Sequence, residues 1–97
     1  MAFVDRYDFD LLKNEAEELV YHELEKRLDS DADVCKCNDC VVDMAAIALN
    51  SVKPLYRFSL LGGMYAAQAM NEKSYADSIY NAVGRAVDKV KSNPSHD

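Results

Sequence analysis

The sequence has few of the residues that interrupt helices. Its 97 residues include three glycines and two prolines, with no tryptophan and no threonine. Long apolar runs are missing as well. The longest, from residue 41 to residue 49, is interrupted by Asp43 and falls far short of the roughly 20 residues that a membrane-spanning helix needs. These absences favour a helical protein without a membrane segment.

Positive charge is also scarce, because 11 Lys and Arg face 17 Asp and Glu for a formal net charge of −6. Such a surface repels nucleic acid polymers. Hydrophobic residues make up 49% and charged residues 29%, which is globular composition. The opening MAFVDRYDFD has neither the basic start nor the apolar core of a secretory leader. We expect a cytoplasmic protein with a single domain over residues 1–97.

Motifs of catalysis are missing from the sequence. There is no phosphate-binding G-x-x-x-x-G-K-[ST], no G-x-G-x-x-G and no H-E-x-x-H. The pair His22-Glu23 is only a fragment of the last motif, and a histidine on an acidic helix is usually a surface residue. The sequence therefore predicts a protein that is not an enzyme.

Two long amphipathic helices are predicted. The first spans Asp10 to about Leu28, with Asp8 or Asp10 as its N-cap, and the other spans Glu72 to about Lys91. Gly84 lies inside the second of these and either permits close approach of another helix or is a tolerated imperfection. The apolar stripes that support the helices are Leu12, Ala16, Leu19, Val20, Leu24 and Leu28, and Tyr75, Ile79, Ala82, Val83, Ala86, Val87 and Val90.

A third predicted helix, Val41 to about Ser51, has almost no polar face, which is typical of the centre of a bundle or of a subunit interface. Asp43 and Asn50 share one narrow strip of it. In one interpretation, Asp43 accepts hydrogen bonds near the helix start and Asn50 caps the helix end. In the other, Asp43 orients a cysteine ligand or a bound partner. A short helix over Met64 to about Met70 completes an all-α bundle of about four helices. Because the stripes need covering, we expect a homodimer.

Three cysteines, Cys35, Cys37 and Cys40, lie inside one six-residue window. An odd number cannot pair fully within the chain, and neighbouring thiols in a reducing compartment favour metal binding, with Zn²⁺ preferred. Asn38 and Asp39 suit the tight turn of such a cysteine knuckle, which lies between the first two helices. A helix start close to Cys40 favours the thiolate form. Redox chemistry at Cys37 and Cys40, or plain exposed thiols, are the alternatives.

Three thiolates leave the fourth position of a tetrahedral zinc site open. It can be taken by a water, by a group from a second chain, or by a side chain of this chain. The side-chain candidates are His22, His96, Asp31, Asp33, Asp39 and Asp43.

Cations and aromatic residues gather near the middle of the chain. Tyr56 and Arg57 follow Pro54, and an arginine fork beside an aromatic ring suits a ligand that carries both a base and a phosphate. The simpler interpretation places Tyr56 in the core and Arg57 on the surface.

The segment from Cys35 to Tyr56, C-K-C-N-D-C-V-V-D-M-A-A-I-A-L-N-S-V-K-P-L-Y, resembles the signature of the late competence development protein ComFB family. The family pattern joins a cysteine cluster to D-x-x-A-x-A-L-N and P-x-Y, here Asp43 to Asn50 and Pro54 to Tyr56. Asn93, Pro94 and His96 resemble its N-P-x-H ending. Lys53 departs from the apolar residue or proline that usually precedes P-x-Y in this family.

This resemblance implies a dimeric, all-helical regulatory protein without catalysis, with zinc held by Cys35, Cys37 and Cys40 and with His96 as the fourth ligand. Members of the family are similar to receptors for cyclic dinucleotides such as c-di-GMP and are linked to competence, motility and pili. A ligand site of Asp43, Asn50, Tyr56 and Arg57 is then expected. A pure assembly protein with structural zinc and a redox-responsive thiol protein are the alternatives.

Overall fold

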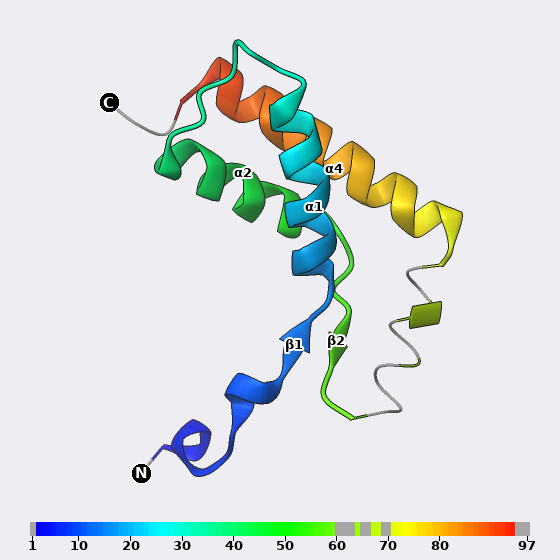
Figure 1. Cartoon of the computed structure of the whole chain (residues 1–97). Coiled ribbons are helices and arrows are strands. Elements are labelled where there is room, and N and C mark those ends of the chain that lie inside the picture. The colour runs from blue at the N-terminus through cyan, green and yellow to red at the C-terminus, as the bar shows by residue number, and fades with distance from the viewer. Residues whose placement is uncertain (1, 60–63, 65–66, 69–70, 95–97) are drawn as a thin grey trace.

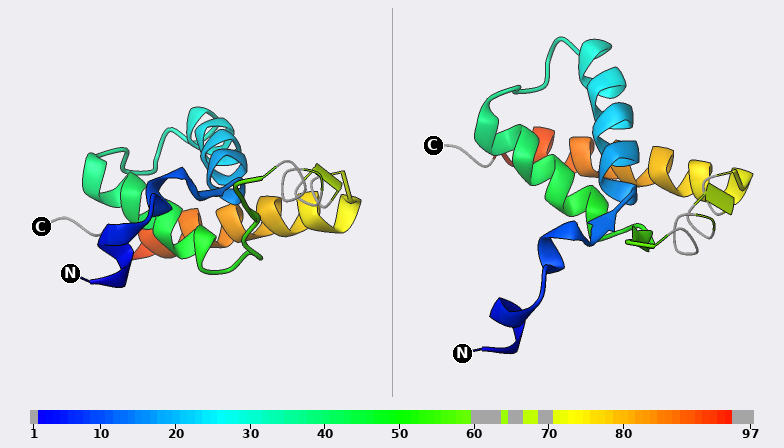
Figure 2. Two further views of the ribbon diagram at one scale, coloured as in Figure 1. Left: turned by 90° about the horizontal axis from the view of Figure 1, so that it is seen from below. Right: turned by 60° about the horizontal axis from the view of Figure 1, so that its bottom comes forward.

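The computed structural model describes residues 2–59, 64, 67–68 and 71–94 of the chain. Its regular elements are two 3₁₀ turns, η1 (Phe3–Arg6) and η2 (Phe9–Leu11), two short strands, β1 (Lys13–Asn14) and β2 (Tyr56–Arg57), and three α-helices. The helices are α1 (Ala16–Asp29), α2 (Asn38–Leu49) and α4 (Lys73–Ser92). Helix α1 lies across α2 and α4, while residues 2–12 lead away from the three helices (Figures 1 and 2).

Helix α4 supplies most of the core. Its predicted stripe is confirmed, because every member of that stripe is buried. The most extensive helix contact joins α4 to α2, and α4 also packs against α1. The buried side chains that it meets there include Val20 and Leu24 of α1 and Met44 and Ala48 of α2. The core is therefore built mainly where α4 packs against α2.

Gly84 is buried at the crossing of α4 and α1. A Cβ atom at this position would lie 3.0 Å from a guanidinium nitrogen of Arg27. The same guanidinium lies over the ring of Tyr80, 5.1 Å from its centroid. The missing side chain thus leaves room for the Arg27 guanidinium rather than for the backbone of another helix, which was the predicted neighbour.

The first helix begins later than its periodicity predicts. Residues 10–12 match the helical spacing, but β1 follows them and pairs antiparallel with β2, with Lys13 opposite Arg57 and Asn14 opposite Tyr56. The prediction of Asp8 or Asp10 as its N-cap was wrong. The Asn14 side chain instead accepts the Ala16 N–H at 3.1 Å at the start of α1.

The predicted bundle of four helices is confirmed only as a mostly helical fold. Within the described ranges there are three α-helices and one two-stranded sheet. Of the fourth predicted helix, Met64 to Met70, only residues 64, 67 and 68 are described, so the rest of that prediction lies outside the described residues.

Helix α2 does not bury its whole circumference within one chain. Cys40, Met44 and Ala48 face the core, whereas Val42 on another side of the helix is 58% exposed. Among the described residues, no helix is long and apolar enough to cross a membrane.

Candidate metal centre

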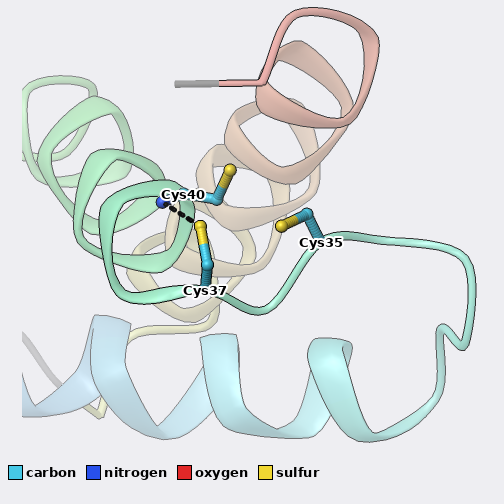
Figure 3. Close-up of side chains that lie close together, drawn as sticks. All are labelled: Cys35, Cys37 and Cys40. Atoms are coloured by element: carbon cyan, nitrogen blue, oxygen red, sulfur yellow. Dashed lines mark hydrogen bonds between the residues drawn. The ribbon is translucent and has the colours of Figure 1, made fainter. Parts of the chain in front are cut away.

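The three cysteines converge at the start of α2. Cys37 is the N-cap residue of this helix, Cys40 lies in its first turn, and Cys35 lies in the segment that precedes it. Their side chains point toward one another (Figure 3). The three sulfur atoms all lie within 4.8 Å of one another. The predicted gathering of these thiols is therefore present in the fold.

The beginning of α2 organises this cluster. The backbone N–H of Cys40 donates to the Sγ atom of Cys37 at 3.4 Å, and the N–H of Val41 donates to the Cys37 carbonyl at 3.0 Å. The first N–H groups of a helix have no acceptor inside the helix, and the Cys37 sulfur accepts one of them. A sulfur that caps a helix in this way is held before any ion arrives.

Burial differs among the three thiols. Cys40 is buried, Cys35 is partly buried and Cys37 is exposed. The cluster therefore joins the core on one side, through Cys40, and reaches solvent on the other, through Cys37. An ion from solution has access from the Cys37 side.

The donor set fits zinc. With Zn–S bonds of about 2.3 Å and tetrahedral angles, ligand sulfurs lie about 3.8 Å apart. The observed limit of 4.8 Å needs only a small contraction to reach this spacing. Soft thiolate ligands also select Zn²⁺ over oxygen-seeking cations. Cys35, Cys37 and Cys40 would hold the ion.

A fourth ligand is not assigned by the described residues. No imidazole or carboxylate within them joins the three-sulfur group, so His22, Asp31, Asp33, Asp39 and Asp43 do not complete it in this arrangement. His96 lies outside the described residues. The C-terminal end of α4 lies beside α2, because Ser92 and the C-cap residue Asn93 line a shallow groove together with Asp43 and Ile47.

The four predicted ligand-binding residues lie in different places. Asn50 is the C-cap of α2, as one interpretation held, and Asp43 is exposed on α2 beside Asp88 and Lys89 of α4. Tyr56 is not in the core, because it is 59% exposed. Arg57 is half-buried on β2. Tyr56 and Arg57 are consecutive residues of β2, whereas Asp43 and Asn50 belong to α2 and to its C-cap.

The surroundings of Tyr56 are acidic. It lines a groove of about 430 Å³ with Glu15, Glu17 and Tyr21 among its other walls. Burial and the nearby carboxylate of Glu17 raise the pKa of the Tyr21 phenol, so this ring stays neutral at physiological pH. The guanidinium of Arg57 donates to the Glu15 carboxylate and forms an ion pair with it.

The sequence analysis did not identify the residues that join the start of α1 to the segment before β2. The Asn14 Oδ1 atom accepts N–H groups from Ala16 at 3.1 Å and from Leu55 at 2.8 Å. The Glu15 N–H donates to the Leu55 carbonyl at 2.8 Å. An asparagine directly before an acidic helical run is an N-cap signal. That signal could have located the true start of α1, but not the contact with Leu55.

A small, mostly helical protein with three converging cysteines that could hold a metal ion is the class that this fold and site define. The family model of the late competence development protein ComFB matches residues 13–94 of the chain. The chain therefore belongs to the ComFB family, as its central motif predicts.

The solved structures contain a similar fold. The structure titled "Structural characterization of the late competence protein ComFB from Bacillus subtilis" matches with a TM-score of 0.66 and 24% sequence identity. The match covers 87% of this chain and 94% of that chain. No curated protein matches the sequence. At this identity the structural likeness supports the fold.

Proposed function

We propose that this protein is a non-enzymatic regulatory module of the ComFB type in which Cys35, Cys37 and Cys40 hold a structural zinc ion. The convergence of all three sulfur atoms within 4.8 Å is the observation that carries the proposal. In this role the thiols are ligands rather than nucleophiles. The bound ion links the segment that precedes α2 to the first turn of this helix, and metal-binding free energy becomes folding free energy in a small domain.

The metal part of the proposal is tested on freshly purified protein by elemental analysis. We expect about one zinc ion per chain, and less than a tenth of that amount in a variant with all three cysteines replaced by serine. The His96→Ala variant tests the fourth ligand, and we expect it to bind zinc more weakly than the unmodified chain does. His22→Ala is its control. Metal-free protein as isolated would contradict the zinc site.

The regulatory part of the proposal is that a cyclic dinucleotide of the c-di-GMP type binds at Tyr56 and Arg57, in the control of competence, motility or pili. Membership of the family motivates the ligand class. An exposed tyrosine ring can stack on a base, and an arginine can form two hydrogen bonds to a phosphate. Since Glu15 already pairs with Arg57, a phosphate has to compete with this carboxylate for the guanidinium.

Isothermal titration with c-di-GMP, with c-di-AMP and with GTP as a linear control tests this ligand. We expect Arg57→Ala and Tyr56→Ala to weaken binding, and Glu15→Gln to strengthen it because the variant frees the guanidinium. Tyr80→Ala, an exposed tyrosine of α4, is the matched control. Absence of heat with either cyclic dinucleotide at high protein concentration would overturn the receptor proposal and leave the metal site unaffected.

A second candidate is an assembly protein with the same structural zinc. It is favoured by the large apolar side chains that the chain exposes, among them Phe3 at 63% and Phe58 at 68%. In this case the working form is a homodimer or a complex with another protein, and no small molecule changes it. The redox alternative can be distinguished from both candidates by experiment. It requires a reversible disulfide between Cys37 and Cys40 and a protein that stays folded after metal removal.

A further inference from the structure

An aromatic surface lies at the start of the chain, outside the region that the family model matches. Residues 2–12 form the N-terminal arm, and the matched region begins at residue 13. Neither η1 nor η2 has a buried residue. The rings of Phe3, Tyr7 and Phe9 nevertheless contact one another, with centroids 5.0 to 6.1 Å apart. The arm thus presents an apolar surface of mutually contacting rings that faces solvent.

The arm makes local hydrogen bonds. The N–H groups of Asp5, Leu11 and Leu12 each donate to a carbonyl three residues earlier. Phe58 is an apolar neighbour of the arm and lines a groove of about 340 Å³ with Tyr7, Phe9 and Leu11. In the views of the whole molecule, the arm leads away from α1, α2 and α4 (Figures 1 and 2). The core of its own chain does not cover these rings.

The chain exposes more surface than a compact protein of its mass. Its accessible area is 6986 Å², whereas about 5,600 Å² is typical for a monomer of this size. Its radius of gyration is 15.5 Å, against about 12.5 Å for a compact chain. The excess area exceeds the roughly 800 Å² per partner that a stable protein interface covers. A second copy of the chain provides a cover of this size.

A receiving surface is present on the helices. The α1/α2 groove (Tyr21, Leu24, Leu28, Val41, Val42 and Ala45) has a volume of about 530 Å³ and is lined mainly by apolar side chains. Tyr21 and Val42 are about half exposed there, at 49% and 58%. The groove lies along the middle and C-terminal half of α1, whereas the arm departs from the N-terminal end of this helix. The arm therefore cannot fill the groove of its own chain without reversing its direction.

We propose that two copies exchange their N-terminal arms, with the aromatic rings of each arm seated in the α1/α2 groove of the other copy. The inference rests on the homodimer considered under the proposed function and assigns its interface. Exchange about a two-fold axis uses both surfaces on each copy, so the assembly closes at two chains. Because each chain carries a net charge of −6, apolar contact drives this association and added salt strengthens it by screening the repulsion.

Sedimentation velocity of the full zinc-loaded chain over a range of concentrations tests the interface. We expect a dimer whose dissociation constant rises at least about thirtyfold in the Phe3→Ser/Phe9→Ser variant and in the Val42→Glu variant. Met64→Ser removes an exposed apolar side chain elsewhere and should leave the constant unchanged. Circular dichroism and zinc content verify that each variant is folded. A dimer that both variants leave intact overturns arm exchange and preserves the homodimer, whereas a monomeric unmodified chain overturns both.

Cross-linking of an otherwise unmodified chain gives a second test that does not depend on disruptive variants. A photoreactive phenylalanine analogue placed at position 9 is irradiated in a mixture of isotopically heavy and light protein. We expect heavy-to-light cross-links from the arm to peptides that contain residues 21–28 or 41–45. Cross-links confined to one chain, or between two arms, would overturn the exchange.

Discussion

The two ends of α2 are held by different chemistry. At its beginning, three sulfur atoms gather within six residues of sequence, where the proposed zinc ion would link them. Beyond its end, the chain is fixed by hydrogen bonds that join residues far apart, with the Asn14 amide bridging to the Leu55 N–H across 41 positions. With zinc bound as proposed, the first end would respond to metal supply and the second would not. The comparison teaches that a small protein can be stabilised by a cluster of residues close in sequence at one end of a helix and by hydrogen bonds between distant residues at the other.

Removal of the sulfurs should have the largest effect. We expect replacement of Cys35, Cys37 and Cys40 by serine to lower the free energy of unfolding by at least about 3 kcal/mol and the melting temperature by about 15 °C. Hydrogen exchange should accelerate at residues 34–41 and remain slow at Ala16 and Leu55. Ala46→Ser, on an exposed position of α2, is the control. An unchanged melting temperature would show that the cysteine end needs no metal.

The Asn14→Ala variant tests the opposite end. It leaves the N–H groups of Ala16 and Leu55 without their acceptor, and we expect a loss of about 2–4 kcal/mol in urea unfolding of the metal-loaded protein. Asn14→Asp keeps an acceptor oxygen at the same place and should cost less than about 1 kcal/mol. Equal losses in the two variants would mean that the side-chain amide does not act as an acceptor for both N–H groups.

Tyr75 links α4 to the segment that follows α2 through one hydrogen bond, so the expected loss of stability is smaller. Its hydroxyl donates to the Lys53 carbonyl at 2.7 Å, and we expect Tyr75→Phe to cost about 1 kcal/mol. Burial raises the pKa of this phenol above its ordinary value of 10.0. The folded state then favours the neutral phenol, so its contribution is complete below pH 10.0 and falls as the pH rises above it. The phenylalanine variant should lose this alkaline dependence, which unfolding measured between pH 9 and about pH 11 would reveal.

The smallest effect is expected at Asp31, which joins the segment before the cysteines to Lys91 of α4 at 3.0 Å. The hydrogen bond from Lys91 holds the pKa of the Asp31 carboxyl below its ordinary value of 3.8. The contribution of this pair is therefore present above pH 3.8 and is lost as the pH falls through the lowered pKa. Asp31→Asn should lower the melting temperature slightly at neutral pH, and about 1 M salt should remove the difference. A difference that persists in high salt would contradict a screened surface pair, and Asp29→Asn is the control.

The parts of the fold that could be predicted are those encoded locally. The stripe of α4 needs only periodicity, and the cysteine cluster needs only a short window of sequence. The start of α1 could not be located from periodicity, because Leu12 matches the helical spacing although the next two residues pair with β2. Contacts such as Asn14 to Leu55 and Glu15 to Arg57 join distant segments and leave no repeating pattern in the sequence.

The predicted site residues also fall into a group placed by local sequence and a group placed by contacts between distant segments. Cys35, Cys37 and Cys40 come together because the turn before a helix brings neighbours to one point. Asp43 and Asn50 share a strip of α2, but Tyr56 and Arg57 follow a turn whose direction no local pattern specifies. The fold places this second pair on β2, beside the acidic start of α1.

The order of the elements along the chain has a consequence for biosynthesis. The thiols need only residues 35–40 in order to meet, whereas the core needs α4, the last of the three helices to be translated. If the cysteines bind zinc as proposed, a nascent polypeptide could therefore bind the ion before α4, which covers α1 and α2, has been translated. Scarcity of zinc would then act on the growing chain at the ribosome, before a finished protein exists to be regulated.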